Sequence, residues 1–230
     1  MRAASAQDPL TDVRRLYDAW NAGNVARAAA LLSPTIIWES FGATPHGLQE
    51  ATLAGGSGGS GGTWRLSPVA IDLLVGVGRH VIALSRRSGA PGAGEAQRLE
   101  VWTVRNGKAD HYRGYPLDEG LAVLRATTGD GKLDLACRAL LAFNRGDRAG
   151  FAGFFVAEAR GFAERLGGAR LDDVRVLAET FEALVISAIH YADEASEGRP
   201  LHLVIGFADE RARLVVPHAT PEAALAAVAV

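Results

Sequence analysis

The chain has 230 residues, of which 48% are hydrophobic, and its 24 basic and 26 acidic residues give a net charge of -2 at pH 7. This length accommodates one large or two small domains with packed cores, and the balanced charge argues against a nucleic-acid or membrane-surface partner. The single cysteine, Cys137, excludes an intramolecular disulfide. No apolar run reaches the about 20 residues of a membrane span and no signal peptide is recognisable, so we expect a cytoplasmic protein.

Two helices and a strand are predicted at the start of the chain. The apolar residues from Val13 to Trp20 recur with the spacing of one helix face. Asn24 is suited to cap a second, Ala-rich helix, and Pro34 breaks that helix ahead of a strand over residues 35–39. The chain therefore begins in the order helix, helix, strand.

The middle of the chain predicts a meander of strands. Residues 48–53 favour a short helix, and the run GGSGGSGG at 55–62 is a flexible coil whose regularity resembles an engineered linker. A natural and an engineered origin of this run both stay open. Strand-like runs follow at 64–74 and 80–86.

A β-hairpin is predicted over residues 98–115. Asn106 and Gly107 stand between two alternating apolar runs, and both residue types accept the positive φ of a two-residue turn. On the first arm, Glu100 and Trp102 share a face. The return arm carries three ionisable or polar groups on one face, namely His111, Arg113 and Tyr115.

The order of elements then recurs. The segment AWNAGN at 19–24 returns as AFNRGD at 142–147, and later strands of the second half echo those of the first. Two copies of one unit explain this pattern, with a boundary in the Gly-, Thr- and Asp-rich stretch 126–131. We predict domains over residues 1–127 and 128–230.

The first copy resembles a SnoaL-like domain of the nuclear-transport-factor-two-like superfamily, which includes ketosteroid isomerases and polyketide cyclases. The segments that carry the resemblance are 14–24, 36–39, 45–47, 61–66 and 101–108. It implies an α+β fold of two tandem cone-shaped (cystatin-like) domains, each a curved antiparallel sheet wrapped around helices, the second degenerate. An apolar cavity is expected at the open end of the first cone.

The resemblance to ketosteroid isomerases implies roles for three residues. Glu100 matches the acid that donates a hydrogen bond to the developing enolate, with Glu in place of Asp. The base position falls on Ser40, one residue after Glu39, and the tyrosine position falls on Leu16, next to Tyr17. Because a slip of one residue moves a side chain to the opposite face of a strand, a related proton-transfer reaction is favoured over steroid isomerisation itself.

Other residues leave alternatives open. His111 has the unperturbed pKa of a general acid or base, or it pairs with a carboxylate on the sheet face. Glu100 is either catalytic or in a salt bridge with Arg113 across the hairpin. Five aromatic residues line a pocket for a flat apolar ligand or form core, namely Trp20, Trp38, Phe41, Trp102 and Tyr115, and Arg113 is a further substrate-binding candidate.

No metal or cofactor site is predicted. The histidines show no ligand spacing, and GGSGGSGG lacks the Lys and the helix that phosphate binding needs. In the second copy Leu203 replaces Glu100, so its cavity is expected to be filled and unreactive. We expect this copy to pair with the first within the chain, and homodimers are a further expectation.

Two functions follow from these residues. The first is a cofactor-free SnoaL-like isomerase, cyclase or dehydratase that acts on a small apolar carbonyl compound, with Glu100, Glu39, His111 and Tyr17 as catalytic candidates. The second is a non-catalytic ligand-binding or scaffold protein of the same fold.

Overall fold

The computed structural model describes residues 8–40, 46–47, 68–87, 96–128, 131–166, 170–180, 182–193, 195–208 and 211–229. The chain divides into two compact units, residues 1–71 with 78–120 and residues 72–77 with 121–230. This division falls slightly before the stretch 126–131 that the sequence indicated. Strand β3 (Val69–Val77) and helix α4 (Leu117–Thr128) each contain a point of division.

The first unit is built on a long helix and a short one. Helix α1 (Pro9–Asn21) buries its apolar stripe, including Leu10, Val13 and Leu16, and packs on β4, β5 and β6. Helix α2 (Val25–Ala30) follows, and the Asn24 side chain accepts a hydrogen bond from the backbone N–H of Arg27 at 3.0 Å. The predicted cap is therefore confirmed.

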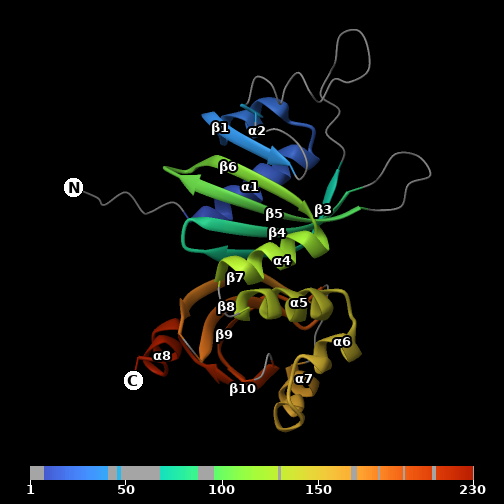
Figure 1. Ribbon diagram of the computed structural model, residues 1–230, viewed down its shortest axis with the longest axis vertical. Coiled ribbons are helices and arrows are strands. Elements are labelled where there is room, and N and C mark those ends of the chain that lie inside the picture. Colours follow the sequence, from blue (N-terminus) through green and yellow to red (C-terminus); the bar gives the residue numbers. More distant parts are fainter. Residues whose placement is uncertain are drawn as a thin grey trace. The chain divides into compact units, whose positions relative to one another are not determined.

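The strands of the first unit form a mixed sheet (Figure 1). Their order is β4-β5-β6-β1-β2, with the bounds β1 (Leu32–Ser40), β2 (His46–Gly47), β4 (His80–Arg87), β5 (Ala96–Arg105) and β6 (Lys108–Pro116). Strands β4, β5 and β6 pair antiparallel, whereas β1 runs parallel to β6. The expected purely antiparallel sheet is therefore wrong for this pair, which a long connection joins rather than a hairpin.

The predicted hairpin is present, with one extra residue. Asn106 and Gly107 adopt φ of 51° and 72°, as the two-residue turn requires. Val104 pairs with Ala109, but Thr103 pairs with His111, so Asp110 forms a bulge in β6. Beyond this bulge, the pairing of β6 with β5 is shifted by one residue relative to a regular hairpin, so that Gly114 lies opposite Glu100.

The second unit also has a long helix of 13 residues and a short one of 6 residues beside its sheet. Its sheet has the order β10-β9-β8-β7, and the end of β3 runs parallel to β7. Helix α5 contributes to the core on one sheet face, and α8 contributes to the core on the other. The bounds are α5 (Lys132–Asn144), α6 (Arg148–Gly153), η1 (Ala157–Ala159), α7 (Arg160–Leu166), β7 (Arg170–Glu179), β8 (Ala183–Tyr191), β9 (Arg199–Ala208), β10 (Arg211–His218) and α8 (Pro221–Ala226).

The end of the long helix is fixed in the same way in both units. The Asn21 amide donates to the Val69 carbonyl at 2.9 Å and accepts from the Val69 N–H at 2.8 Å. Asn144 makes the same pair of bonds to Leu171, at 2.8 and 2.7 Å. Each asparagine thus joins the end of a helix to the start of a strand.

We expect Asn21→Ala and Asn144→Ala each to lower the free energy of unfolding by about 1–3 kcal/mol, because each leaves a partly buried backbone donor and acceptor without the side chain that satisfied them. Urea denaturation followed by circular dichroism measures this loss. A change of only a few tenths of a kcal/mol would mean that water replaces the side chain without cost.

Candidate functional site

Glu100 is the centre of a buried polar network in the first unit. Its side chain is 0% exposed. Arg87 Nη2 donates to Glu100 Oε1 at 2.6 Å, Tyr112 Oη donates to the same oxygen at 3.1 Å, and Tyr17 Oη donates to Oε2. The carboxylate is therefore held by one cation and two phenols from three different elements.

The two tyrosines are held as hydrogen-bond donors. Burial and the neighbouring Glu100 charge raise the pKa of Tyr17 well above its usual value, and the same two causes raise the pKa of Tyr112. The indole of Trp102 donates to Tyr17 Oη at 2.8 Å, which fixes the phenol between an N–H and the carboxylate. Both hydroxyls therefore stay protonated at neutral pH.

Arg87 supplies the positive charge of the network. Burial is the largest effect and by itself lowers the pKa of its guanidinium, but Glu100, Tyr112 and Tyr17 together outweigh burial and the net shift is upward. The guanidinium carbon also lies 5.8 Å from the centre of the Trp20 ring. The Arg87 side chain is 26% exposed, so this end of the network reaches solvent.

Aromatic rings form one wall of the site. Trp38 stacks on Tyr112 with ring centres 4.1 Å apart and on Trp20 at 6.3 Å, and its edge meets Trp102 at 5.6 Å. Trp38 reaches this position because β1 pairs in parallel with β6, which sets Trp38 beside Tyr112. Apolar surface therefore surrounds a charged pair.

Gly114 makes room for this arrangement. It lies directly opposite Glu100 on β6. A Cβ atom at this position would collide with the Tyr112 hydroxyl. A larger residue at 114 would therefore displace Tyr112 from the carboxylate.

Three buried donors beside Glu100 have no hydrogen-bond partner among the described residues. They are Ser85 Oγ, Arg87 Nε and Arg98 Nε. Ser85 pairs with Arg98 across β4 and β5, and Arg98 lies two residues from Glu100 on the same sheet face. Because buried polar groups are almost always satisfied, an oxygen-bearing ligand is the natural partner for these donors.

Glu39, His111 and Arg113 form a separate cluster on the opposite sheet face. Arg113 Nε donates to Glu39 Oε2 at 2.7 Å, and His111 Nε2 lies 3.1 Å from Glu39 Oε1. Burial raises the pKa of Glu39, but the hydrogen bonds and charges of Arg113 and His111 outweigh it and lower the pKa overall. These three residues cannot act together with Glu100 on one ligand atom.

This cluster predicts a small, pH-dependent contribution to stability. A carboxylate whose pKa is lowered by folding stabilises the fold above its unfolded pKa and loses this effect as pH falls through its folded pKa. We expect Glu39→Gln to cost about 0.2–1 kcal/mol at pH 7. The difference from the wild type should shrink below pH 4.5, the unperturbed value. Urea titrations at pH 3 and 7 measure it, and an equal loss at both would contradict it.

The structure therefore divides the residues predicted from sequence into two groups. Glu100, Tyr17, Trp20, Trp38 and Trp102 come together around one carboxylate, whereas Glu39, His111, Arg113 and Tyr115 belong to the outer face. Phe41 lies outside the described residues. The alternative salt bridge between Glu100 and Arg113 is wrong, because Arg87 pairs with Glu100 and Glu39 pairs with Arg113.

Sequence reasoning missed Arg87, Tyr112, Ser85 and Arg98. Arg87 and Ser85 share a face of β4 with Ala83, which pairs with Glu100. The alternation of the predicted strand at 80–86, continued to residue 87, places both side chains on one face. It shows that this face is the one of Glu100 only once the pairing of β4 with β5 is known. Tyr112 was missed because the bulge at Asp110 moves it to the face of Trp102.

The second unit places apolar residues at the positions of the network. Glu100 pairs with Ala83 and Gly114, and Leu203 pairs correspondingly with Ile186 and Pro217. The same register places Ile205 and Val215 where the first unit has Trp102 and Tyr112. Leu140 lies four residues before Asn144, as Tyr17 lies four residues before Asn21. In this register Leu203 therefore occupies the position that corresponds to Glu100.

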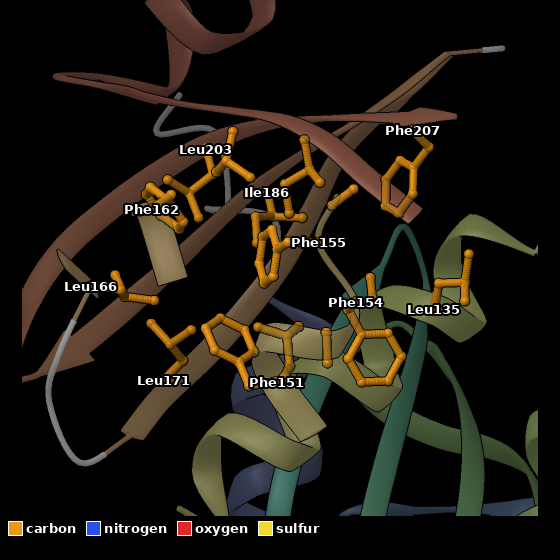
Figure 2. Close-up of a pocket in the computed structure, with 16 residues that line it drawn as sticks. Leu135, Phe151, Phe154, Phe155, Phe162, Leu166, Leu171, Ile186, Leu203 and Phe207 are labelled. Atoms are coloured by element: carbon orange, nitrogen blue, oxygen red, sulfur yellow. The ribbon is translucent and has the colours of Figure 1, made fainter. Parts of the chain in front are cut away.

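The expectation that this second cavity is filled is wrong. A cavity of about 40 Å³ lies among these residues, and Figure 2 shows the leucine, isoleucine and phenylalanine side chains that surround it. Smaller side chains replace an indole and two phenols here, which leaves space that α5 and the sheet do not close. None of the lining residues that the structure describes is ionisable.

No group of three or more His, Cys, Asp or Glu side chains in the part of the chain that the structure describes is arranged to hold a metal ion. Within the same residues, no helix combines the length and the apolar character needed to cross a bilayer.

Comparison with known proteins identifies the fold of the first unit. Residues 13–112 match the family described as SnoaL-like domain. No curated protein matches the chain. The likeness to a SnoaL-like domain is therefore confined to residues 13–112, which include only residues 72–77 of the second unit.

Solved structures of this kind also resemble the chain. An NTF2-like protein from Burkholderia thailandensis is 23% identical, with a TM-score of 0.40 over 51% of this chain and 97% of its own. A LEH-like epoxide hydrolase from M. tuberculosis is 17% identical, with a TM-score of 0.39 over 53% of this chain and 96% of its own. A provisionally assigned ketosteroid isomerase from Kribbella flavida is 14% identical, with a TM-score of 0.39 over 47% and 76%.

Proposed function

We propose that the first unit is a cofactor-free enzyme that moves a proton on a small, largely apolar carbonyl compound, with Glu100 as the group that takes and returns the proton. The observation that carries this proposal is the buried network of Glu100, Arg87, Tyr17 and Tyr112 beside three unpartnered donors. Strongly perturbed ionisable groups cluster at functional sites.

The second unit supplies an internal comparison. It builds the same hairpin register and the same helix end around Leu203, Leu140, Ile205 and Val215. The fold is therefore satisfied by apolar residues at these positions. Since a buried ion pair seldom stabilises more than well-packed apolar residues of similar volume, retention of the charged set in the first unit is better explained by function than by stability.

The Glu100 carboxylate can accept one further hydrogen bond. Its two oxygens offer about four acceptor positions, and Arg87, Tyr112 and Tyr17 occupy three of them. The remaining position belongs to Oε2, which accepts one bond against two on Oε1. In the proposed step, Oε2 removes the proton from the carbon next to the substrate carbonyl.

The unpartnered donors suit the charge that this step creates. Loss of the proton leaves negative charge on the carbonyl oxygen, and donors aimed at a developing oxyanion are a large source of catalysis. Arg87 Nε, Arg98 Nε and Ser85 Oγ are the proposed donors. Trp20 and Trp38 then pack on the apolar body of the substrate, and the proton returns from Glu100 to a carbon of the enolate.

Deuterium exchange tests this function without knowledge of the natural substrate. Flat apolar ketones such as 2-tetralone and 1-indanone are incubated in D₂O with the protein, and exchange next to the carbonyl is followed by proton NMR. We expect exchange above the buffer rate for at least one ketone, and loss of that exchange in Glu100→Gln. Glu39→Gln is the matched control, because Glu39 lies on the other sheet face.

The non-catalytic function has its own support. Glu100 is fully buried and already bound by three donors, which suits a structural centre that holds a ligand without reacting. Under this alternative a ketone binds, as NMR line broadening would report, but no exchange exceeds the buffer rate. The two functions therefore give different results in one sample.

We also propose that the second unit is a degenerate copy of the first. Support comes from the matching asparagine clamps and from β10, where Ala212 N donates to Phe154 O at 2.8 Å as Ala109 N donates to Leu31 O at 2.9 Å in the first unit. Pairing of the two copies within the chain, or of two chains, stays a prediction.

A further inference from the structure

The described residues that line the cavity of the second unit all carry hydrocarbon side chains. All sixteen lining residues are Ala, Val, Leu, Ile or Phe. Leu203, Ile186 and Leu171, at 3%, 1% and 2% exposure, are the most buried of its lining residues. Phe162 and Phe207 are only half-buried, so the lining extends toward the surface through aromatic rings (Figure 2).

Water is a poor occupant of this space. A buried water needs two to four polar partners, and the side chains around the cavity offer none. A polar ligand group would lose its own hydrogen bonds there. The chemistry of the lining therefore selects a group that carries no hydrogen-bonding atom.

The size of the cavity limits what enters it. Its volume is about 40 Å³, a few times the about 10–15 Å³ that a cavity needs in order to hold one water molecule. A ring the size of benzene was found in an apolar cavity of about 150 Å³ in another protein. A methyl-terminated chain fits better, with its end inside and the preceding methylenes along Phe162 and Phe207.

We propose that this cavity is a second, unreactive binding site that takes the end of a free aliphatic chain whose polar head stays in water. The site lies where the first unit has Glu100, but it has no group that could give or take a proton. It shares no residue with the proposed active site, so its existence does not depend on the function of the first unit.

A series of n-alcohols from butanol to octanol tests this site in the full chain. Spectra of the ¹³C-labelled Ile, Leu and Val methyl groups are recorded at increasing alcohol concentration. We expect saturable shifts confined to the cavity, led by Ile186 and Leu203. The affinity should rise about fourfold for each added methylene. Absence of saturation with octanol, or shifts spread evenly over both units, would overturn the proposal.

Two variants locate the site. Leu203→Phe fills the cavity and should abolish the saturable shifts, whereas Leu214→Phe makes the same change at a side chain that is 52% exposed and should leave them unchanged. Should Leu203→Phe fail to fold, Ile186→Val enlarges the cavity by one methylene and should tighten octanol binding. Equal octanol binding in Leu203→Phe and Leu214→Phe, or weaker binding in Ile186→Val, would place the alcohol elsewhere.

Discussion

Arg87→Met is expected to lower the free energy of unfolding by about 3–5 kcal/mol, because it removes the only cation paired with Glu100 among the described residues and leaves a buried charge without compensation. Methionine keeps an unbranched apolar side chain, so packing against Trp20 changes little. The loss of stability therefore reports the charge pairing between Arg87 and Glu100 rather than a loss of packed side-chain volume.

Arg113→Met provides the matched control. Arg113 is 51% exposed and pairs with Glu39 on the outer face. Exposed ion pairs contribute about 0–1 kcal/mol, so this variant should unfold at nearly the wild-type urea concentration. Similar losses in the two variants would show that Glu100 is solvated in solution and that the network does not hold a buried charge.

Glu100→Gln is expected to reduce ketone deuterium exchange by about 10²–10⁴-fold, the range that a positioned general base contributes. Glutamine keeps the size of the side chain, and its one amide oxygen can still accept hydrogen bonds from Arg87 and Tyr112, which share Oε1 of Glu100, but it cannot take up a proton. Circular dichroism and the urea midpoint confirm that the variant is folded before the rates are compared.

The pattern of losses separates catalysis from positioning. Tyr17→Phe removes a donor to Glu100 and should slow exchange less than Glu100→Gln, because the base itself remains. Glu39→Gln should keep the wild-type rate. Loss of exchange in Glu39→Gln but not in Glu100→Gln would move the reaction to the outer face and contradict the proposed site.

Much of the fold was predictable because local signals agreed with it. The capping side chain of Asn24, the turn at Asn106 and Gly107, and the apolar spacing of α1 each depend on residues close in sequence. The repeated AWNAGN and AFNRGD segments mark the two asparagine clamps. Such features need no knowledge of how distant strands pair.

The site was harder to predict because it depends on register. A regular two-residue hairpin would set Glu100 opposite Arg113, and this pairing suggested the salt bridge that the structure lacks. The extra residue at Asp110 shifts the pairing by one, so Gly114 faces Glu100 and Tyr112 turns inward. Nothing in the sequence of β6 announces this bulge.

Arg87 was hidden for a similar reason. Its partner is thirteen residues away along the chain, but the alignment of β4 with β5 depends on the connection over residues 88–95 and not on either strand alone. In the second unit the reverse happened: the loss of the acid at Leu203 was readable, whereas the cavity depended on the combined volumes of α5 and the sheet side chains.

One triple variant addresses whether the network exists for function or for folding. Arg87→Met, Glu100→Leu and Tyr112→Phe together give the first unit an apolar set like that of the second. If the network is retained for function, the free energy of unfolding of this variant lies within about 2 kcal/mol of the wild-type value. The variant then shows no ketone deuterium exchange above the buffer rate. A variant that fails to fold, or that exchanges at the wild-type rate, would contradict this.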